Sequence, residues 1–534
     1  MRVKRAFIIA IAIAIALGTF YRFYRLDGKL YTNDEATTSV HVSGHTVAEY
    51  DAAAGAGKVT RIGDLASFQR VDPHTSMRDV VGGLAIEDPQ HPPLFYVMER
   101  LWQSSFGDSI ASRRALPAVF GTLAVAGAYF FGLTLTGSLT FAFVLATLVA
   151  VSPFHVLYAQ QAREYSLWTC LIFASSTALL RAVAAPSPQR FAIYALALAA
   201  ALYTDVLSVY TLVAHVIFTA VAYRAEVRRV LLPFALAVLA ALAAFAPWIA
   251  TLIRGRSAIT NNVYLSGALP VKLFVLKWIF NLGAVFYDLD YERHATAILL
   301  VPIFATIIAG AVLLARHAGW RTAFFVAVLG ATTALAFLIP DVVRHESRST
   351  SSRYLIPAWL ACECAVAFAI ASWLQSPRIR LNRSGAFVFG SFILMGLVSV
   401  AVASQREFWW GDAGIAPIGP ISRVLRAATP PVTVVFVRKR TYDFGPMLLA
   451  DAVDPAVRLV YLNPSQALAR SKTSGSAFLL DPDQRALSDF QRRGYNTEAA
   501  YRQGTADATV AAMRREAASS RKMDGPDASL WRLR

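Results

Sequence analysis

Two adjacent carboxylates follow the first apolar segment of the chain. The run from Thr32 to Glu35 has the form of a capping box, in which Thr32 caps a helix and Glu35 closes the box three residues later. Carboxylates held just outside a bilayer indicate chemistry at the membrane face on a lipid-borne substrate. We therefore predict Asp34 and Glu35 as candidate catalytic residues. The structural alternative is that Glu35 only caps the helix and that Asp34 only favours the helix N-terminus.

A polar stripe would extend from Asp34 if this helix continued. Residues three and four positions apart share one helix face, so Asp34, Thr38, His41 and His45 would lie in a row while Glu35 points elsewhere. The sequence thus predicts His41 and His45 as further site residues. The alternative is that both histidines are solvated.

A second polar group surrounds Asp88 and His91. Two prolines, Pro92 and Pro93, follow directly and favour the first turn of a helix. A carboxylate and an imidazole at this spacing can bind a divalent cation. Many surface pairs of this kind bind nothing, so the metal interpretation and the structural one both stay open.

A third polar group lies between two apolar segments, in the loop from 158 to 165. Polar and ionisable groups at the mouth of a helical bundle are costly unless they are paired or used. A functional role is favoured, although Arg163 and Glu164 could simply pair with each other or with headgroups. The predicted site residues of this loop are Tyr158, Gln160, Gln161, Arg163, Glu164 and Tyr165.

The composition indicates an integral membrane protein. Hydrophobic residues make up 56% of the 534 residues and charged residues only 16%, which exceeds what a soluble core requires. The net charge of +17 comes from short clusters between apolar segments and from the C-terminal tail, so it gives no support to nucleic-acid binding. All three cysteines fall in apolar runs, which argues against a disulfide framework.

Apolar stretches long enough to cross a bilayer recur along the first 404 residues. The first runs from 6 to 21 and is followed by Arg22 and Arg25 rather than by a cleavage site, so we expect a retained helix with its N-terminus in the cytoplasm. About eleven spans are predicted, the others at 114–134, 138–157, 166–184, 190–205, 206–223, 229–252, 294–316, 322–340, 353–374 and 384–404.

The segment 91–106 is better explained as an interfacial helix than as a span. It is short and carries Glu99 and Arg100 in its middle. Leaving it out of the spans places the later arginine clusters on the cytoplasmic side, as the positive-inside rule requires. The outer face then carries 22–113, 158–165, 254–293, 341–352 and everything after 405.

The C-terminal part has a different character. Short buried strands are predicted at 432–437, 457–462 and 477–480, and a helix at 506–518. We expect an all-α polytopic membrane module over 1–404 and a small extracytoplasmic α/β domain over 405–534.

Several motifs follow one another in a fixed order along the chain. They are the acidic pair after the first span, His91-Pro92-Pro93-Leu94-x-Tyr96, Arg114-Ala115-Leu116-Pro117, the run Ser152-Pro153-Phe154-His155 to Arg163-x-Tyr165, and Arg353-Tyr354. Together they resemble the GT-C type membrane glycosyltransferases that use polyprenyl-phosphate sugars, a group that includes protein O-mannosyltransferases and the lipid A aminoarabinose transferase. The resemblance covers about residues 1 to 405, and it departs at Gln161, where many relatives have Glu.

The resemblance implies an inverting transfer of sugar to an acceptor hydroxyl, at the outer face of a bacterial-type cytoplasmic membrane. The acceptor could be a protein, a glycolipid or a polysaccharide. Asp34 would act as the base, and some members hold a divalent metal ion, for which Asp88 and His91 are the candidates here. The departing phosphate needs cations, and the candidates on the outer face are Arg163, Arg254, Arg256, Arg344, Arg348 and Arg353.

Two other function classes remain. A transporter or lipid flippase would place ionisable residues within spans and would show internal repeats. Only Asp205, at a predicted outer turn, and Glu363 stand out among the apolar stretches, and no repeat is visible. A non-catalytic assembly partner would be expected to lack the acidic pair, which is present.

Overall fold

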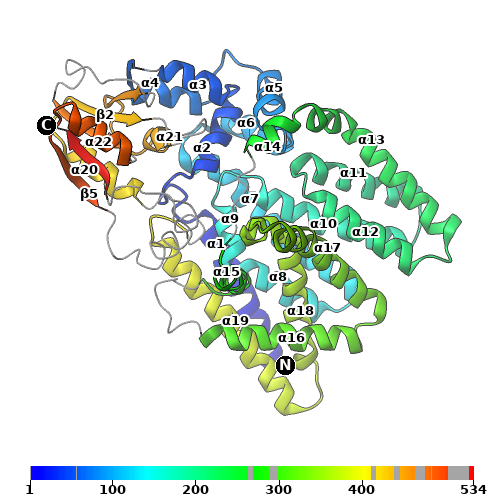
Figure 1. Cartoon of the computed structure of the whole chain (residues 1–534). Coiled ribbons are helices and arrows are strands. Elements are labelled where there is room, and N and C mark those ends of the chain that lie inside the picture. The colour runs from blue at the N-terminus through cyan, green and yellow to red at the C-terminus, as the bar shows by residue number, and fades with distance from the viewer. Residues whose placement is uncertain are drawn as a thin grey trace. The chain divides into compact units, whose positions relative to one another are not determined.

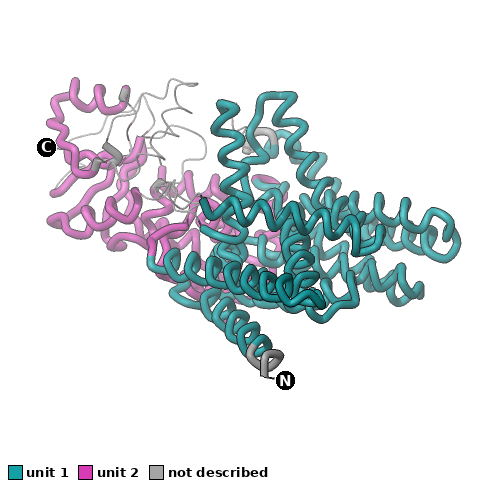
Figure 2. The backbone as a smooth tube through the Cα atoms, turned by 90° about the horizontal axis from the view of Figure 1, so that it is seen from below, with its two compact units in different colours: residues 1–26, 88–95, 113–405 teal, residues 27–87, 96–112, 406–534 magenta. Residues whose placement is uncertain are grey.

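The chain divides into two units, which Figure 2 shows in teal and magenta. Unit 1 comprises Met1–Leu26, Asp88–Phe95 and Arg113–Gln405, and unit 2 comprises Asp27–Glu87, Tyr96–Ser112 and Arg406–Arg534. The computed structural model describes residues 2–55, 57–262, 269–288, 298–409, 417–437, 445–462, 475–480, 482, 484–502 and 528–533.

Unit 1 is helical (Figure 1). Its central helix is α18 (Ile356–Leu374): 78% of its apolar stretch is buried, against 22% for α17 (Trp320–Arg344). The other helices are α1 (Arg2–Phe23), α7 (Ile110–Thr136), α8 (Leu139–Val151), α9 (Pro153–Ala159), α10 (Tyr165–Ala184), α11 (Pro188–Thr204), α12 (Ser208–Ala222), α13 (Leu232–Arg254), α14 (Arg256–Asn262), α15 (Val271–Ala284), α16 (Leu300–His317) and α19 (Ile379–Ser404), with short turns η2 (Val227–Leu231), η4 (Arg348–Thr350) and η5 (Ser352–Leu355).

The number of membrane spans differs from the predicted eleven. Among the described residues, seven helices are long and apolar enough to cross a bilayer, or eight if α8 and α9 form one bent span. The predicted spans at 6–21 and 206–223 form shorter apolar helices, Phe7–Phe23 and α12. Because a span needs about 20 residues, these helices do not confirm the count. The chain is nevertheless an integral membrane protein.

The predicted span at 138–157 is broken at Ser152. The helices α8 and α9 meet there at an angle of 59°. Ser152 caps α9, accepting a hydrogen bond from His155 N, and Pro153 takes the first helical position, where it lacks an N–H to offer the preceding turn. The last carbonyls of α8 therefore need other donors.

Arg22 supplies those donors from the end of α1. Its guanidinium is fully buried and donates from Nη1 to Ala150 O at 2.6 Å and from Nη2 to Val149 O at 2.8 Å. Gly18 permits the close approach, because a Cβ there would lie 2.2 Å from Ala150 O. The break in the span is thus stabilised by the first helix of the unit.

The chain on either side of this contact is also anchored. The Gln160 side chain, just after α9, donates to Tyr21 O at 2.7 Å and to Tyr24 O at 2.9 Å. Arg114 on α7 donates to Leu26 O at 2.8 Å. The end of α1 and the loop after α9 are therefore fixed against each other.

Unit 2 is an α/β unit with a six-stranded sheet in the order β1-β3-β2-β4-β6-β5. The strands β2, β3 and β4 are parallel, and the other pairings are antiparallel. The elements are α2 (Asn33–Ser43), α3 (Val47–Ala54), β1 (Val59–Arg61), α4 (Ile62–Ala66), η1 (Ser67–Gln69), α5 (Met77–Glu87), α6 (Leu94–Phe106, which begins in unit 1), α20 (Ile418–Ala427), β2 (Val432–Val437), α21 (Gly445–Leu449), β3 (Arg458–Leu462), β4 (Ser476–Leu480), α22 (Gln484–Arg492), β5 (Thr497–Arg502) and β6 (Ala528–Leu533).

Both faces of the sheet are buried, as expected for a mixed sheet of this kind. Val434 and Phe436 share one core with Val40 of α2, whereas Val435 lies in the other core with Phe490 of α22. The three predicted strands are present at nearly the predicted positions. The predicted helix at 506–518 lies outside the described residues.

Unit 1 ends at Gln405, close to the end of the expected module over 1–404, and residues of that stretch contribute to both units. Strand β1, from the first loop, pairs antiparallel with β3 of the C-terminal part. Residues 27–87 and 96–112 accordingly group with the sheet. The pairing was missed because β1 is only three residues long and carries no strand pattern.

Replacing Arg22 with Met is expected to destabilise unit 1 by about 3 kcal/mol, because Val149 O and Ala150 O would be left buried without donors. Thermal unfolding of the full chain in lipid nanodiscs measures the effect. Arg25→Met is the matched control, since Arg25 is exposed and donates to the Gln405 side chain instead of to the carbonyls at the end of α8. Equal melting temperatures for the two variants would contradict the role of Arg22.

Candidate functional site

The loop between α9 and α10 is buried, although nearly all its side chains are polar. Gln160, Gln161, Arg163 and Glu164 are at most 6% exposed. Headgroup contact therefore does not explain this loop. Buried polar groups of this density are normally paired, and their partners define the site.

Glu164 is the centre of an ionic cluster in unit 1. Its Oε1 lies 3.0 Å from Arg163 Nη2 and 3.0 Å from His91 Nδ1. His91 Nε2 lies 4.0 Å from Asp88 Oδ2. The pairing of Arg163 with Glu164, which was the structural alternative for this loop, is present, and the structure adds the second polar group, Asp88 and His91, to the same cluster.

The pKa values of this cluster are shifted by opposing causes. Burial disfavours the charged form of Glu164, but the charges of Arg163 and His91 outweigh it and lower the pKa to about 2. Burial and the Arg163 charge lower the pKa of His91, yet the carboxylates of Asp88 and Glu164 raise it above its ordinary value overall. The cluster thus favours an ionised Glu164 beside a protonated His91.

Asp205 is a further carboxyl group in this electrostatic environment. It follows α11 and is 6% exposed, and its Oδ1 accepts a hydrogen bond from Leu207 N at 2.8 Å. Burial and the negative charge of Glu164 raise its pKa to about 7, against the opposing effects of the Leu207 N–H, His91 and Arg163. Asp205 therefore titrates near neutral pH.

Two of the six predicted arginines meet at the ring of Tyr165. The guanidinium carbons of Arg163 and Arg353 lie 5.5 and 5.8 Å from its centroid. Tyr158 packs edge-on against Tyr165 at 5.0 Å, and its Oη lies 3.3 Å from Ser352 Oγ. A pair of guanidinium groups at one aromatic ring can bind a phosphate with fork-like hydrogen bonds.

The other predicted arginines have different surroundings. Arg348 pairs through Nε with Glu346 Oε2 at 2.9 Å, and its backbone N–H donates to Asp341 Oδ1. The side chains of Arg254, Arg256 and Arg344 are exposed. The structure thus separates Arg163 and Arg353 from the rest of the predicted set.

In unit 2 the capping box at the start of α2 is present as predicted. Glu35 N donates to Thr32 Oγ1 at 3.2 Å, and Thr32 N donates to Glu35 Oε2 at 3.0 Å. Glu35 is 0% exposed, whereas Asp34 is partly exposed. Of the acidic pair, Glu35 has a capping role and Asp34 is the one accessible from outside.

The predicted polar stripe ends before His45. Helix α2 stops at Ser43, and Gly44 follows in the left-handed conformation with φ of 90°. His45 lies 3.2 Å from Asp72 Oδ2 and 3.5 Å from Glu49 Oε2. His41 is buried, with its Nε2 4.0 Å from Glu87 Oε2, so the alternative that both histidines are solvated does not hold for His41.

Arg100 of α6 orients α2 and was missed by the sequence analysis. Its guanidinium donates to Val42 O at 2.9 Å and Ser43 O at 2.8 Å, at the C-terminal end of α2, and to Asp72 O and Thr75 O. The α6 segment was expected to be an interfacial helix, but the side of α6 that carries Arg100 faces the protein interior. In the sequence, the role of Arg100 was signalled only by a basic residue within an apolar run.

No group of three or more His, Cys, Asp or Glu that could hold a metal ion occurs among the described residues. Arg163 Nη2 lies 3.4 Å from both ring nitrogens of His91, where a bound cation would meet a positive charge. The divalent ion at Asp88 and His91 stays a prediction.

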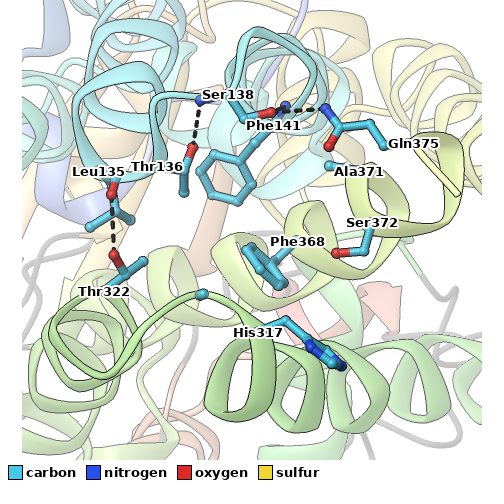
Figure 3. A pocket seen from close by; sticks show the side chains of 11 residues that line it. Leu135, Thr136, Ser138, Phe141, His317, Thr322, Phe368, Ala371, Ser372 and Gln375 are labelled. Atoms are coloured by element: carbon cyan, nitrogen blue, oxygen red, sulfur yellow. Dashed lines mark hydrogen bonds between the residues drawn. The ribbon is translucent and has the colours of Figure 1, made fainter.

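A separate pocket of about 200 Å³ lies between the ends of α7, α8, α16, α17 and α18 (Figure 3). Its polar groups largely satisfy one another: Gln375 Nε2 donates to Ser138 Oγ, and Thr322 Oγ1 donates to Leu135 O. It contains none of the predicted site residues, so it is not the candidate site.

No protein-family model and no curated protein matches the sequence. Among solved structures, the fold is similar to the aminoarabinose transferase ArnT from Cupriavidus metallidurans bound to undecaprenyl phosphate, with a TM-score of 0.56 at 14% identity, over 93% of this chain and 96% of that one. The apo form of ArnT matches with a TM-score of 0.53 at 13% identity, over 94% and 97%. The chain has the GT-C fold.

The archaeal oligosaccharyltransferase AglB from Archaeoglobus fulgidus is a weaker match, with a TM-score of 0.49 at 10% identity, over 89% of this chain and 69% of that one. The two matches to ArnT confirm, at the level of the fold, the GT-C resemblance inferred from the motifs.

A pH-dependent stability is expected from Asp205. Its pKa is raised in the folded chain, so the folded state binds the proton more tightly, and stability falls as pH rises from about 4 to about 7, by about 1.4 kcal/mol per pH unit. Asp205→Asn should remove this fall, so its melting temperature relative to wild type should be higher at pH 8 than at pH 5. The exposed Asp27→Asn serves as control. A difference from wild type that is the same at both pH values would contradict the raised pKa.

Proposed function

We propose that the chain is a membrane glycosyltransferase that transfers a sugar from a polyprenyl-phosphate donor to an acceptor hydroxyl at the outer face of the membrane. The observation that carries the proposal is the meeting of Arg163 and Arg353 at Tyr165, in a fold similar to that of an undecaprenyl-phosphate-binding transferase. The N-terminus would be cytoplasmic and the sheet unit extracytoplasmic, in accordance with the positive-inside rule.

The two arginines would bind the donor phosphate. As the bond from the sugar to the phosphate breaks, negative charge accumulates on the phosphate oxygens, and fixed cations in a buried site stabilise that charge. Arg163 is 3% exposed and is held in place by its ion pair with Glu164, while the guanidinium of Arg353 lies over the rings of Tyr165 and Tyr354. We assign Arg353 and Arg163 to the phosphate together.

Asp34 would be the general base. An acceptor hydroxyl is a weak nucleophile, and a carboxylate that takes its proton during attack accelerates transfer by about 10²–10⁴-fold. Attack from the side opposite to the phosphate would invert the anomeric configuration. Glu35 is a poor alternative, because its carboxylate closes the capping box and is 0% exposed. The acceptor would be a protein, a glycolipid or a polysaccharide.

Transport is less well supported. A transporter needs ionisable groups that bind and release along a pathway. In unit 1 the buried Arg22 donates to backbone carbonyls, and the buried Glu363 pairs with His155. Both contacts join helices of the unit, so they have a structural explanation. Release of free polyprenyl phosphate, measured below, separates the two functions.

Asp34→Asn is expected to lower the rate of sugar transfer at least about 100-fold, because the amide cannot take the proton. Purified protein in lipid is incubated with polyprenyl-phosphate sugars and candidate acceptors, and release of polyprenyl phosphate is followed. Glu35→Gln is the matched neighbour, and it should lower stability more than rate. Transfer by Asp34→Asn at the wild-type rate would exclude Asp34 as the base.

The same transfer assay with a chelator added to the wild-type protein tests the need for a divalent metal ion. Full activity in the presence of the chelator would exclude a metal requirement.

Arg353→Gln is expected to weaken binding of polyprenyl phosphate about tenfold or more, since a charge-assisted hydrogen bond is lost. Binding of polyprenyl phosphate to the chain in nanodiscs is measured directly. Arg316→Gln is the control, because Arg316 is exposed at the end of α16. Arg163→Gln should weaken binding as well, but it also leaves Glu164 without its cation. Unchanged affinity in Arg353→Gln would contradict the phosphate site.

A further inference from the structure

Glu363 and His155 form a buried pair that the proposed chemistry does not use. His155 Nε2 lies 3.0 Å from Glu363 Oε2, and the two residues are 5% and 0% exposed. His155 belongs to α9, which leads into the loop that carries Arg163. Glu363 belongs to α18, which directly follows the turn η5 that carries Arg353. The pair therefore joins the two elements that present the two arginines.

Burying such a pair is costly for the fold. An ionisable carboxyl group in a helical membrane unit costs several kcal/mol to desolvate, and an apolar pair of the same volume is often as stable or more so. The cost is not fully offset here: Glu363 Oε1 has no hydrogen-bond partner among the described residues. Arg22 adds an electrostatic attraction to Glu363. Polar pairs of this kind are known to fix the register of packed helices.

Two further contacts connect the same elements closer to the arginines. Tyr158, one turn after His155 on α9, lies with its Oη 3.3 Å from Ser352 Oγ. The indole of Trp359, in the first turn of α18, donates to Ser352 O at 2.8 Å. Beyond them, both guanidinium groups approach the ring of Tyr165. Ser352 of η5 thus links Tyr158 of α9 to Trp359 of α18, between the buried pair and the arginines.

We propose that Glu363 and His155 are positioning residues that hold α9 against α18 and so set the spacing of Arg163 and Arg353. The proposal rests on the proposed function, since it assigns a purpose to that spacing. Neither residue contacts the phosphate. Binding by two guanidinium groups needs their separation fixed to within a fraction of an ångström, and a shift in the helices that carry them weakens both contacts together.

The test compares Glu363→Gln with His215→Gln in the full chain in nanodiscs. His215 is an equally buried histidine of unit 1, bonded to Ser176 at 3.1 Å and Tyr194 at 3.2 Å, and both partners lie on other helices, α10 and α11. Each variant disturbs buried polar contacts between helices: one for Glu363 and two for His215. The measurements are melting temperature, Kd for polyprenyl phosphate alone, and KM and kcat for transfer.

Glu363→Gln is expected to raise Kd and the donor KM about tenfold while kcat stays within about threefold, because donor binding is lost equally in the ground and transition states. His215→Gln should change the melting temperature only. The double variant His155→Gln with Glu363→Gln should bind polyprenyl phosphate with the same Kd as Glu363→Gln alone, since the two residues act through one contact.

Wild-type affinity in Glu363→Gln, or an equal loss of affinity in His215→Gln, would overturn the proposal. If Glu363→Gln does not fold, Tyr158→Phe and Ser352→Ala test the same attachment of α9 to α18 and should raise Kd in the same direction; wild-type Kd in both would overturn it too. Failure of the wild-type chain to bind polyprenyl phosphate at all would instead count against the proposed function. The two failures are therefore distinguishable.

Discussion

The arrangement of unit 1 depends on one guanidinium group. Arg22 donates to the carbonyls left over where α8 ends, and without those hydrogen bonds the bend into α9 would leave buried acceptors unsatisfied. The bend directs the loop after α9 into the protein, where Gln160 bonds back to the end of α1. A single arginine on the first helix thus permits a polar loop to lie inside a membrane protein.

The polar loop brings opposite charges together under the same constraint. Glu164 accepts from Arg163 and lies beside His91, so the buried charges are balanced without solvent. Arg353 approaches the same Tyr165 ring from η5, the turn just before α18, which is far from Tyr165 in the sequence. The candidate site is therefore built by contacts between segments that lie about 70 to 200 residues apart, which explains why its parts are conspicuous but separate in the sequence.

Local chemistry was predictable, whereas long-range placement was not. The capping box at Thr32 and Glu35 was found because it depends on four consecutive residues, and the buried strands were found because their composition is local. The break at Ser152 was indicated in the sequence by a serine that precedes a proline. Hydropathy alone nevertheless predicts one continuous span across it. Three features depend on partners that are distant in the sequence, about which periodicity carries no information. They are the burial of His41, the pairing of β1 with β3, and the approach of Arg163 and Arg353 to the Tyr165 ring.

The most direct measurement is an experimental structure of the full chain in lipid with bound polyprenyl phosphate. We predict that the phosphate lies within hydrogen-bonding distance of both Arg163 and Arg353, beside the ring of Tyr165. A phosphate bound at Arg254, Arg256 or Arg344 instead, with the two guanidinium groups at Tyr165 left without it, would contradict the assignment of the donor site.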